Sequence, residues 1–582
     1  MAIERGRFQQ VVEAVRARDG AELGAQVRAA WPSALRLARH VCLALLAGLL
    51  GSVVAVVVMG ALRLWWGTPT PPELVGERIL PLLPADQFVA LLIRYQPNPK
   101  MGPLSQALLG QVALGVLLGA PYAVAVWRVG GMRDAKAGRA PWLPNRRAWL
   151  VAGAFALGME LLALALFWPV LGAGLYGDPV GTARLLTALA LALTFGAFAV
   201  TVALAYQAFW RVWGAWVEGV NGATQQEAQA STNGEQAAAS ASAQVVSRRE
   251  ALAVAGGAAV ILVAGAVATN RLIAGYLAKS NLSYEGLAVP ESVTSAITPT
   301  NDFYIVSKNV LDPTVTVSRW RLEVDGLIGR PTSWTYDELV KLPAETRAVT
   351  LECISNQVDG RLMSTAQWRG VLLKTLLERA GGVGTPEGKH AVFYGVDGYV
   401  TSLSLPDLLE ARALLAYRMN GETLPERHGF PLRAVVPGRY GEQSAKWVTR
   451  IEITDHEVKG FYQSQGWSAA QLETISRIDG PHTQASLGEI LISGVAFAGI
   501  RGIQQVEVSV DGGTTWQRAS LQPPLSDQTW VFWNWTRRPA APGMYTIVAR
   551  ATDGTGKLQT EEKRGTVPNG ATGWHEIKIV VK

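Results

Sequence analysis

Two hydrophobic patterns divide the chain. Up to about residue 278 the apolar residues form long uninterrupted runs, and after it they alternate with polar residues over short stretches. A helix needs ~20 mainly apolar residues to cross ~30 Å of hydrocarbon, so the long runs predict an α-helical transmembrane domain with five spans. The predicted spans cover about residues 41–62, 104–127, 149–171, 185–209 and 251–269.

Basic residues in the connections predict the orientation of these spans. The N-terminal segment carries seven arginines, and the connection between the second and third spans carries six Lys and Arg residues. In the first-to-second connection the basic residues are diluted by Glu73, Glu77 and Asp86. The positive-inside rule therefore places the N-terminus in the cytoplasm. Five spans then predict a multi-pass protein of a bacterial plasma membrane, with everything after residue 278 extracytoplasmic.

A polar segment precedes the fifth span. Residues 219–247 are rich in Gln, Ala, Ser, Asn and Thr and predict a flexible cytoplasmic linker. Arg248 and Arg249 follow directly, and this layout resembles a twin-arginine export signal placed inside the chain. Two arginines that flank a span under the positive-inside rule are the alternative, and the sequence leaves both open.

The predicted spans contain few residues that could hold a cofactor. Of six histidines only His40 lies near a span, so paired axial ligands for a b-type haem are missing. Glu160 is the one acidic residue at membrane depth, which is typical of a proton, ion or ligand site. A quinone site beside Glu160 is one interpretation. A protonated glutamic acid hydrogen-bonded to a neighbouring helix is the other.

Charge is divided as unevenly as hydropathy. Residues 1–278 have a net charge of +8 and residues 279–582 a net charge of −1, which together give the +7 of the whole chain. The basic pI of about 9.3 therefore belongs to the membrane-facing part. A nucleic-acid partner is not expected, because it would need a basic patch on the soluble part.

The second half of the chain predicts two soluble domains. Residues 279–476 mix short strands with short helices, as in an α+β domain, and strands are expected at about 319–324, 349–354, 391–399 and 432–436. Residues 477–582 alternate short strands with Gly-rich turns, as in an all-β sandwich. The predicted domains are residues 1–218, 219–247, 248–278, 279–476 and 477–582.

Cys353 is the candidate reactive residue. Apolar side chains alternate at Val349, Leu351 and Cys353, which places the thiol at the end of a half-buried strand, just before a Ser-Asn turn. The other cysteine, Cys42, lies in an apolar run, so no disulfide between the two is expected. A single cysteine taken alone is more often a buried small hydrophobe than a ligand.

The surroundings of Cys353 carry a family resemblance. The sequence reads V-T-L-E-C-I-S-N at 349–356 and W-R-G at 368–370. It resembles the sulfite oxidase family of molybdopterin enzymes, in which a cysteine at a strand end ligates molybdenum. Further segments match the family in the same order, over roughly 280 residues in all, which is more specific than any single motif. They are residues 298–304, 320–326, 417–425, 428–433, 437–438 and 446–447.

The resemblance implies a molybdenum–molybdopterin cofactor with one molybdenum per chain and Cys353 as its protein ligand. A thiolate is the soft, electron-rich donor that this metal requires. Tyr399 matches the tyrosine beside the metal's oxo group and is the second catalytic candidate. The residues implied in holding the pterin and its phosphate are Asn301, Tyr304, Lys308, Asn309, Asp397, His428, Arg433, Ser444, Ala445 and Lys446.

Several of these residues have a structural alternative when taken singly. Tyr399 also fits a strand tyrosine packed in the core. His428 fits a loop histidine bonded to the backbone, and Arg433 and Lys446 fit a solvated strand face. The last domain resembles the family's immunoglobulin-like dimerisation domain, which implies a homodimer through residues 477–582.

One departure from the family bears on the substrate. Sulfite oxidases follow the metal cysteine with a stretch whose arginine helps to bind the sulfite dianion, whereas this chain has Ser355-Asn356-Gln357-Val358. Burying a dianion without a cation would cost several kcal/mol, so efficient sulfite oxidation is not expected. Lys308, Arg361 or Arg439 could restore a cation.

These observations predict an enzyme, a membrane-anchored molybdenum-dependent oxidoreductase. It would transfer an oxygen atom and two electrons to or from a small sulfur or nitrogen compound, and exchange electrons with a separate carrier, a quinone or a cytochrome. A reductase of sulfoxides, of the kind that acts on protein methionine sulfoxide, is the alternative within this class. A non-catalytic surface adhesion protein is the alternative from another class.

Overall fold

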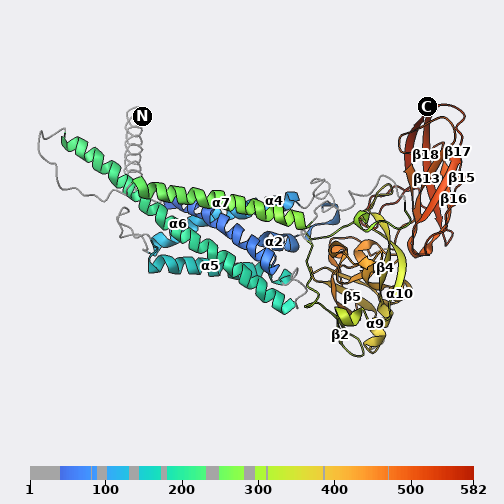
Figure 1. The fold of residues 1–582 in the computed structure, drawn as a ribbon, viewed down its shortest axis with the longest axis horizontal. Coiled ribbons are helices and arrows are strands. Elements are labelled where there is room, and N and C mark those ends of the chain that lie inside the picture. Colours follow the sequence, from blue (N-terminus) through green and yellow to red (C-terminus); the bar gives the residue numbers. More distant parts are fainter. Residues whose placement is uncertain are drawn as a thin grey trace, which may run out of the picture. The chain divides into compact units, whose positions relative to one another are not determined.

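The protein was analysed as a computed structural model that describes residues 40–79, 82–87, 101–129, 143–171, 180–230, 248–280, 295–309, 312–384, 387–469 and 471–582. The chain forms two compact units (Figure 1). The first consists of Met1–Leu62, Gln106–Leu166 and Ala188–Ala274, and the second of Arg63–Ser105, Phe167–Thr187 and Gly275–Lys582. The seven N-terminal arginines lie outside the described residues.

The helices of the first unit agree with the predicted spans. Five helical segments are long and apolar enough to cross a membrane: His40–Trp66, Gln106–Arg128, Arg146–Val170, Gly181–Trp213 and Leu252–Thr269. They belong to the His40–Trp66 helix and to α4 (Met101–Arg128), α5 (Arg146–Phe167), α6 (Val180–Ala230) and α7 (Arg248–Ser280). A buried cluster that includes Ala47, Tyr122, Ala152 and Phe198 packs four of them together. Among the described residues, Glu160 in α5 has a carboxylate oxygen with no hydrogen-bond partner.

The predicted linker is wrong over its first part. Helix α6 does not end near residue 209 but continues to Ala230, so the first residues of the predicted linker 219–247 are helical. The cause is local, because Ala, Gln and Glu in residues 223–230 are strong helix formers although they are too polar for a membrane span. Residues 231–247 lie outside the described residues.

The second unit begins with helix α2 (Pro71–Ile79), from the connection between the first two spans. Thr70 starts this helix, since its backbone N–H donates to Glu73 Oε2 at 2.7 Å and its hydroxyl accepts from the Glu73 N–H at 3.4 Å. Arg63 holds the same glutamate in a salt bridge of 3.2 Å. This part of the connection is therefore ordered by its own side chains.

The domain around Cys353 has two sheets, and its mixture of strands and short helices is of the predicted α+β kind. One sheet has the order β2-β1-β10-β5-β6 and the other β3-β4-β7-β8, with β9 on β7. The only parallel pair among their described pairings is β1 with β10. The first sheet consists of β1 (Arg321–Gly326), β2 (Thr332–Thr335), β5 (His390–Gly395), β6 (Val400–Ser404) and β10 (Val448–Thr454). The second consists of β3 (Glu345–Glu352), β4 (Met363–Leu372), β7 (Leu414–Met419), β8 (Glu422–Thr423) and β9 (Arg433–Val435).

One predicted strand is divided by a turn. The expected strand 391–399 ends at Gly395, and β6 begins only at Val400. Gly398 takes a positive φ of 73° in the turn between them, a conformation that glycine adopts without strain. Tyr399 therefore lies at the turn that joins β5 to β6 and not within a strand.

The C-terminal domain is built from two facing sheets, as the alternating pattern predicts (Figure 1). Their orders are β11-β13-β17-β16 and β12-β19-β18-β14-β15. Ile492 from the first sheet and Ile547 and Ile579 from the second share one buried core. The strands are β11 (Ile475–Gly480), β12 (Gln484–Ala485), β13 (Ile490–Phe497), β14 (Ile503–Ser509), β15 (Gln517–Arg518), β16 (Ser520–Leu521), β17 (Val531–Arg537), β18 (Gly543–Asp553) and β19 (His575–Val581).

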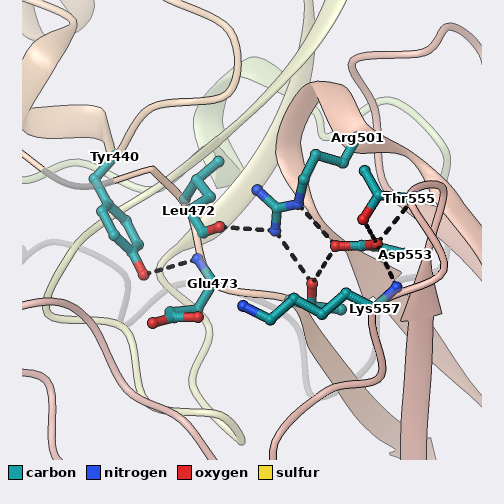
Figure 2. A network of polar contacts seen from close by, with 8 residues as sticks. Tyr440, Leu472, Glu473, Arg501, Asp553, Thr555 and Lys557 are labelled. Atoms are coloured by element: carbon teal, nitrogen blue, oxygen red, sulfur yellow. Dashed lines mark hydrogen bonds and ion pairs between the residues drawn. The ribbon is translucent and has the colours of Figure 1, made fainter.

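A polar network lies where the chain enters this domain (Figure 2). The guanidinium of Arg501 donates to Asp553 Oδ2 at 2.8 Å and to the Leu472 carbonyl at 2.9 Å. The other oxygen of Asp553 accepts from the Thr555 hydroxyl at 2.6 Å and from the Lys557 N–H at 3.1 Å. The network thus ties strand β18 to the segment that precedes β11.

Candidate active site

The thiol of Cys353 lies directly after strand β3. The Cys353 N–H donates to the Leu362 carbonyl at 2.9 Å, and the Asn356 N–H donates to the Cys353 carbonyl at 2.9 Å, which closes a turn. The Asn356 side chain braces this turn, since its amide donates to Glu352 Oε1 at 3.0 Å and its oxygen accepts from the Leu362 N–H at 2.9 Å. The Cys353 sulfur lies 3.0 Å from the Ser355 hydroxyl. A rigid strand end therefore fixes the position of the sulfur.

Cys353 opens into a cavity of about 850 Å³, a volume that includes space open to solvent. Ten of the predicted site residues line it: Tyr304, Lys308, Cys353, Asp397, Tyr399, His428, Arg433, Ser444, Ala445 and Lys446. Asn309 lies behind the wall, where it is buried and donates to Asp397 Oδ2 at 2.8 Å. Asn301 is exposed in the short helix Thr300–Asp302 and is not among the lining residues.

A buried cationic cluster forms one side of the cavity. Arg433 at the start of β9 donates to the His428 carbonyl at 3.2 Å and stacks over Trp368 at 5.2 Å. Among the described residues no carboxylate pairs with Arg433, and its Nε has no hydrogen-bond partner. Burial lowers the pKa of Arg433 to about 10, which leaves it charged at neutral pH. A buried guanidinium without a counterion is costly, so the cluster is suited to an anion.

His428 lies beside Arg433 as a neutral imidazole. Burial, reinforced by the charges of Arg433 and Lys446, lowers its pKa to about 3. Its Nε2 lies 3.2 Å from the Thr300 carbonyl, which can only accept, so Nε2 carries the proton. An anion bound here would raise the pKa of the imidazole, because an opposite charge favours its protonated form.

Two glycines allow the loops of the site to approach one another. Gly429, with φ 114°, ends the short helix Glu426–His428, and a Cβ on it would lie 3.0 Å from the Lys446 Cβ. A Cβ on Gly441 would collide with the Tyr304 hydroxyl. Either substitution would push apart elements that line the cavity.

The hydroxyl of Tyr399 is engaged with the backbone. It donates to the Glu442 carbonyl at 2.5 Å, whereas the sequence predicts a hydroxyl that donates to substrate or to an oxo ligand. Burial raises the pKa of Tyr399 well above its ordinary value, so the phenol keeps its proton. Its predicted catalytic role remains a prediction.

Glu442 is a cavity residue that the sequence reasoning missed. Its Oε1 accepts from the amides of Gln443 at 3.2 Å and Gln463 at 3.1 Å, and its Oε2 has no partner among the described residues. Burial raises the pKa of Glu442 to about 8, so the carboxyl is mostly protonated at neutral pH. Its position two residues before Ser444, which the sequence already assigns to the cofactor, is the signal that could have identified it.

Of the three cations considered for the substrate, only Lys308 lines the cavity. Its ammonium donates to the carbonyl of Asp397 at 2.9 Å and to Asn309 Oδ1 at 2.9 Å. Arg439 instead binds Asp407 at 2.7 Å, and Arg361 is not among the lining residues. A third partner of Lys308 is Glu77 of α2, at 2.5 Å, which no sequence pattern links to this site.

Comparisons with known proteins identify the family of this fold. The Oxidoreductase molybdopterin binding domain matches residues 309–462, and the Mo-co oxidoreductase dimerisation domain matches residues 469–582. Mitochondrial sulfite oxidase of Rattus norvegicus is 31% identical over 347 residues, which cover 50% of this chain and 63% of the relative. Sulfite oxidase of Gallus gallus is 31% identical over 337 residues, which cover 48% of this chain and 72% of the relative. The chain therefore belongs to the sulfite oxidase family of molybdopterin-binding oxidoreductases.

A solved structure aligns with about half of the chain. The sulfane dehydrogenase SoxCD from Paracoccus pantotrophus is 25% identical, with a TM-score of 0.46, and the alignment covers 49% of this chain and 82% of that chain. The domain matches and the sulfite oxidase relatives imply a molybdenum–molybdopterin cofactor. The residues present fit it, because a fixed thiol and the buried guanidinium of Arg433, which pairs with no carboxylate among the described residues, line one cavity.

Proposed function

We propose that the protein is a membrane-anchored molybdopterin oxidoreductase that transfers an oxygen atom, with two electrons, to or from a small sulfur or nitrogen compound. The proposal rests on one observation: the Cys353 thiol and the buried, charged guanidinium of Arg433 line the same cavity. A structural cysteine would not need a neighbouring anion site. The chain spans 63% of the length of the rat relative. The proposed reaction therefore rests on the residues of the site and not on the activity of that relative.

The chain's residues divide into two groups around the proposed cofactor. Cys353 would ligate the metal, and Arg433, His428, Lys446 and Ser444 would hold the phosphate of the pterin. The remaining pterin contacts would come from Tyr304, Asn309, Asp397 and Ala445. When bound, the cofactor supplies a metal that exchanges an oxygen atom together with two electrons.

The protein's own part in the reaction is to control protons and water. Reducing a sulfoxide to a sulfide consumes two electrons and two protons and releases water, and the oxidative direction returns the protons. The Glu442 carboxyl, with its raised pKa of about 8, can hold a proton at the cavity wall near neutral pH. Tyr399 fixes the Glu442 backbone through its hydrogen bond, and so positions that carboxyl.

The proposed location, export route, electron carrier and oligomeric state are those that the sequence predicts. The five apolar helices would span a bacterial plasma membrane, with the catalytic and C-terminal domains outside. Arg248 and Arg249 would direct export of the folded, cofactor-loaded domain by the fifth span. Replacing both with lysine should leave the catalytic domain inside, and unchanged protease accessibility from outside would reject this role. A quinone or cytochrome would carry electrons, and the immunoglobulin-like C-terminal domain would form a homodimer.

Metal analysis tests the proposal most directly. Purified full-length protein from cells that make molybdopterin should contain about one molybdenum per chain, and Cys353→Ser should lose it because oxygen is a poorer ligand than thiolate for this site. Absence of molybdenum from the wild-type protein would favour a non-catalytic adhesion protein. A stopped-flow screen of both oxidation states against sulfite, sulfoxides and N-oxides would then identify the substrate and the direction.

A further inference from the structure

Lys308 lines the cavity, and its ammonium already donates hydrogen bonds to other groups of the protein. Only 3% of its side chain is exposed. It donates to the Asp397 carbonyl, to Asn309 Oδ1 and, at 2.5 Å, to Glu77 Oε2. Asn309 also binds the Asp397 carboxylate, so two carboxylates, those of Glu77 and Asp397, lie around one ammonium.

Glu77 reaches this site from the connection between the first two predicted spans. The same segment is anchored a second time, where the Ala85 N–H donates to the Gln465 carbonyl at 2.9 Å. Ala85 is buried in a cluster with Ile354 and Trp467, which both line the cavity. Together with the capped start of α2 at Thr70, these contacts hold the Glu77 carboxylate against the ammonium of Lys308, which lines the cavity.

The consequence is electrostatic. A lone lysine at this position would attract a small oxyanion, as the missing family arginine would. With Glu77 and Asp397 beside it, the group of three side chains has no net positive charge, and an oxyanion would have to approach two carboxylates at low solvent exposure. Screening by water is weak at such a site, so the penalty for an anion is large and that for an uncharged oxide is small.

We propose that Glu77 is a specificity-determining residue that neutralises Lys308 and makes the site select uncharged sulfur or nitrogen oxides over oxyanions such as sulfite. This inference rests on the proposed function, since it names the substrate class of that same site. It also assigns a role to helix α2, which places Glu77 against a lysine of the cavity lining.

Sulfate binding tests the inference without turnover. Isothermal titration of cofactor-loaded full-length protein in detergent at pH 8 should show weak sulfate binding by the wild type. Glu77→Gln keeps the shape and a hydrogen-bond acceptor but removes the charge, and should bind sulfate about 10-fold more tightly. Burial raises the pKa of Glu77 and Lys308 opposes that rise, so the titration is run above neutral pH, where a carboxyl with a raised pKa is more fully ionised.

Three variants control the measurement. Glu77→Asp retains the charge and should keep the wild-type affinity. Asp86→Asn removes one exposed charge from the same segment and should also change nothing. Adding Lys308→Gln to Glu77→Gln should abolish the gain. Equal affinity of Glu77→Gln and wild type, or an equal gain in Asp86→Asn, would overturn the inference.

A kinetic measurement separates this inference from the proposed function. If the protein turns over small oxides, Glu77→Gln should raise kcat/KM for sulfite about 10-fold and leave that for dimethyl sulfoxide nearly unchanged. A gain in sulfate affinity with no turnover of either compound would reject the proposed function while the charge effect of Glu77 stands. Equal changes for both substrates would reject the selectivity.

Discussion

Two arginines in the second unit, one partly buried and one buried, have opposite surroundings. Arg501 meets a carboxylate whose two oxygens are both bonded, Oδ2 to Arg501 and Thr474 and Oδ1 to Thr555 and the Lys557 N–H (Figure 2). Arg433 is more deeply buried, and among the residues that the structure describes it meets a backbone carbonyl and the face of Trp368 but no carboxylate. The first arginine is balanced by the chain itself, whereas the second is balanced only when an anion binds.

This difference separates a charge that stabilises the fold from one that serves a ligand. Burying an ion pair roughly repays its desolvation when every polar atom is bonded. Burying Arg433 without a counterion lowers the free energy of unfolding, and binding of an anion to this site raises it again. The network around Arg501 should therefore affect the stability of the C-terminal domain. Arg433 should instead affect how tightly the cofactor is bound.

The largest effect is expected from Arg433→Met. It should weaken retention of the pterin phosphate by about 3 kcal/mol, roughly a hundredfold, so purified protein would lose most of its molybdenum and organic phosphate. The cofactor-free variant should unfold at a temperature no lower than cofactor-free wild type, because a costly charge has been replaced. Arg439→Met, which removes an arginine paired with Asp407, should retain molybdenum. A cofactor-loaded Arg433→Met would contradict the comparison.

Asp553→Asn should affect folding instead of cofactor binding. Burial by itself raises the pKa of Asp553, but hydrogen bonds from Thr555, Arg501 and the Lys557 backbone outweigh it and lower the pKa to about 2. Breaking this network should cost ~2–3 kcal/mol, seen as a lower midpoint for thermal unfolding of the C-terminal domain.

The pH dependence of that loss has a definite sign. The folded pKa of Asp553 lies below the ordinary 3.8, so its stabilisation is present above about pH 4 and disappears as the pH falls through 2. Wild type and Asp553→Asn should therefore converge in acid. Asp527→Asn, at an exposed position in the same domain, should follow wild type at every pH, and a constant gap between Asp553→Asn and wild type would argue against an ionised Asp553.

A smaller effect with the opposite sign is expected from Glu442→Gln. Because the folded pKa of Glu442 is raised to about 8, its contribution is fully present below the ordinary pKa of 4.5 and is lost as the pH rises through 8. Between pH 5 and 8 the wild type should lose ~1–3 kcal/mol relative to the Gln variant, measured by thermal unfolding of the loaded protein. Glu410→Gln, at an exposed position, should show no such drift.

The parts of the fold that the sequence predicts well are those decided by local pattern. The apolar runs locate the five long helices, and alternation at Val349 and Leu351 places Cys353 at the end of β3. The segments that match the family before and after Cys353 also contain many of the residues that line the cavity. Each of these features is determined by residues that are close to one another in the sequence.

The parts that escaped prediction depend on contacts between distant residues. Glu77 meets Lys308 across 231 positions, and only folding reveals that pair. The Tyr399 hydroxyl is taken by a backbone carbonyl 43 positions away, which no side-chain pattern encodes. Helix α6 passes its predicted end because helix propensity continues after apolarity stops.

The docking of α2 has a practical consequence for handling this protein. A shortened soluble version that starts at residue 279 would keep Cys353 and the pterin cavity but would leave Glu77 behind. Lys308 would then lose its Glu77 partner while keeping the Asp397 carbonyl and Asn309 as acceptors, so assays on this version would overestimate the affinity of the site for oxyanions. Substrate profiles should therefore be measured on a chain that includes helix α2.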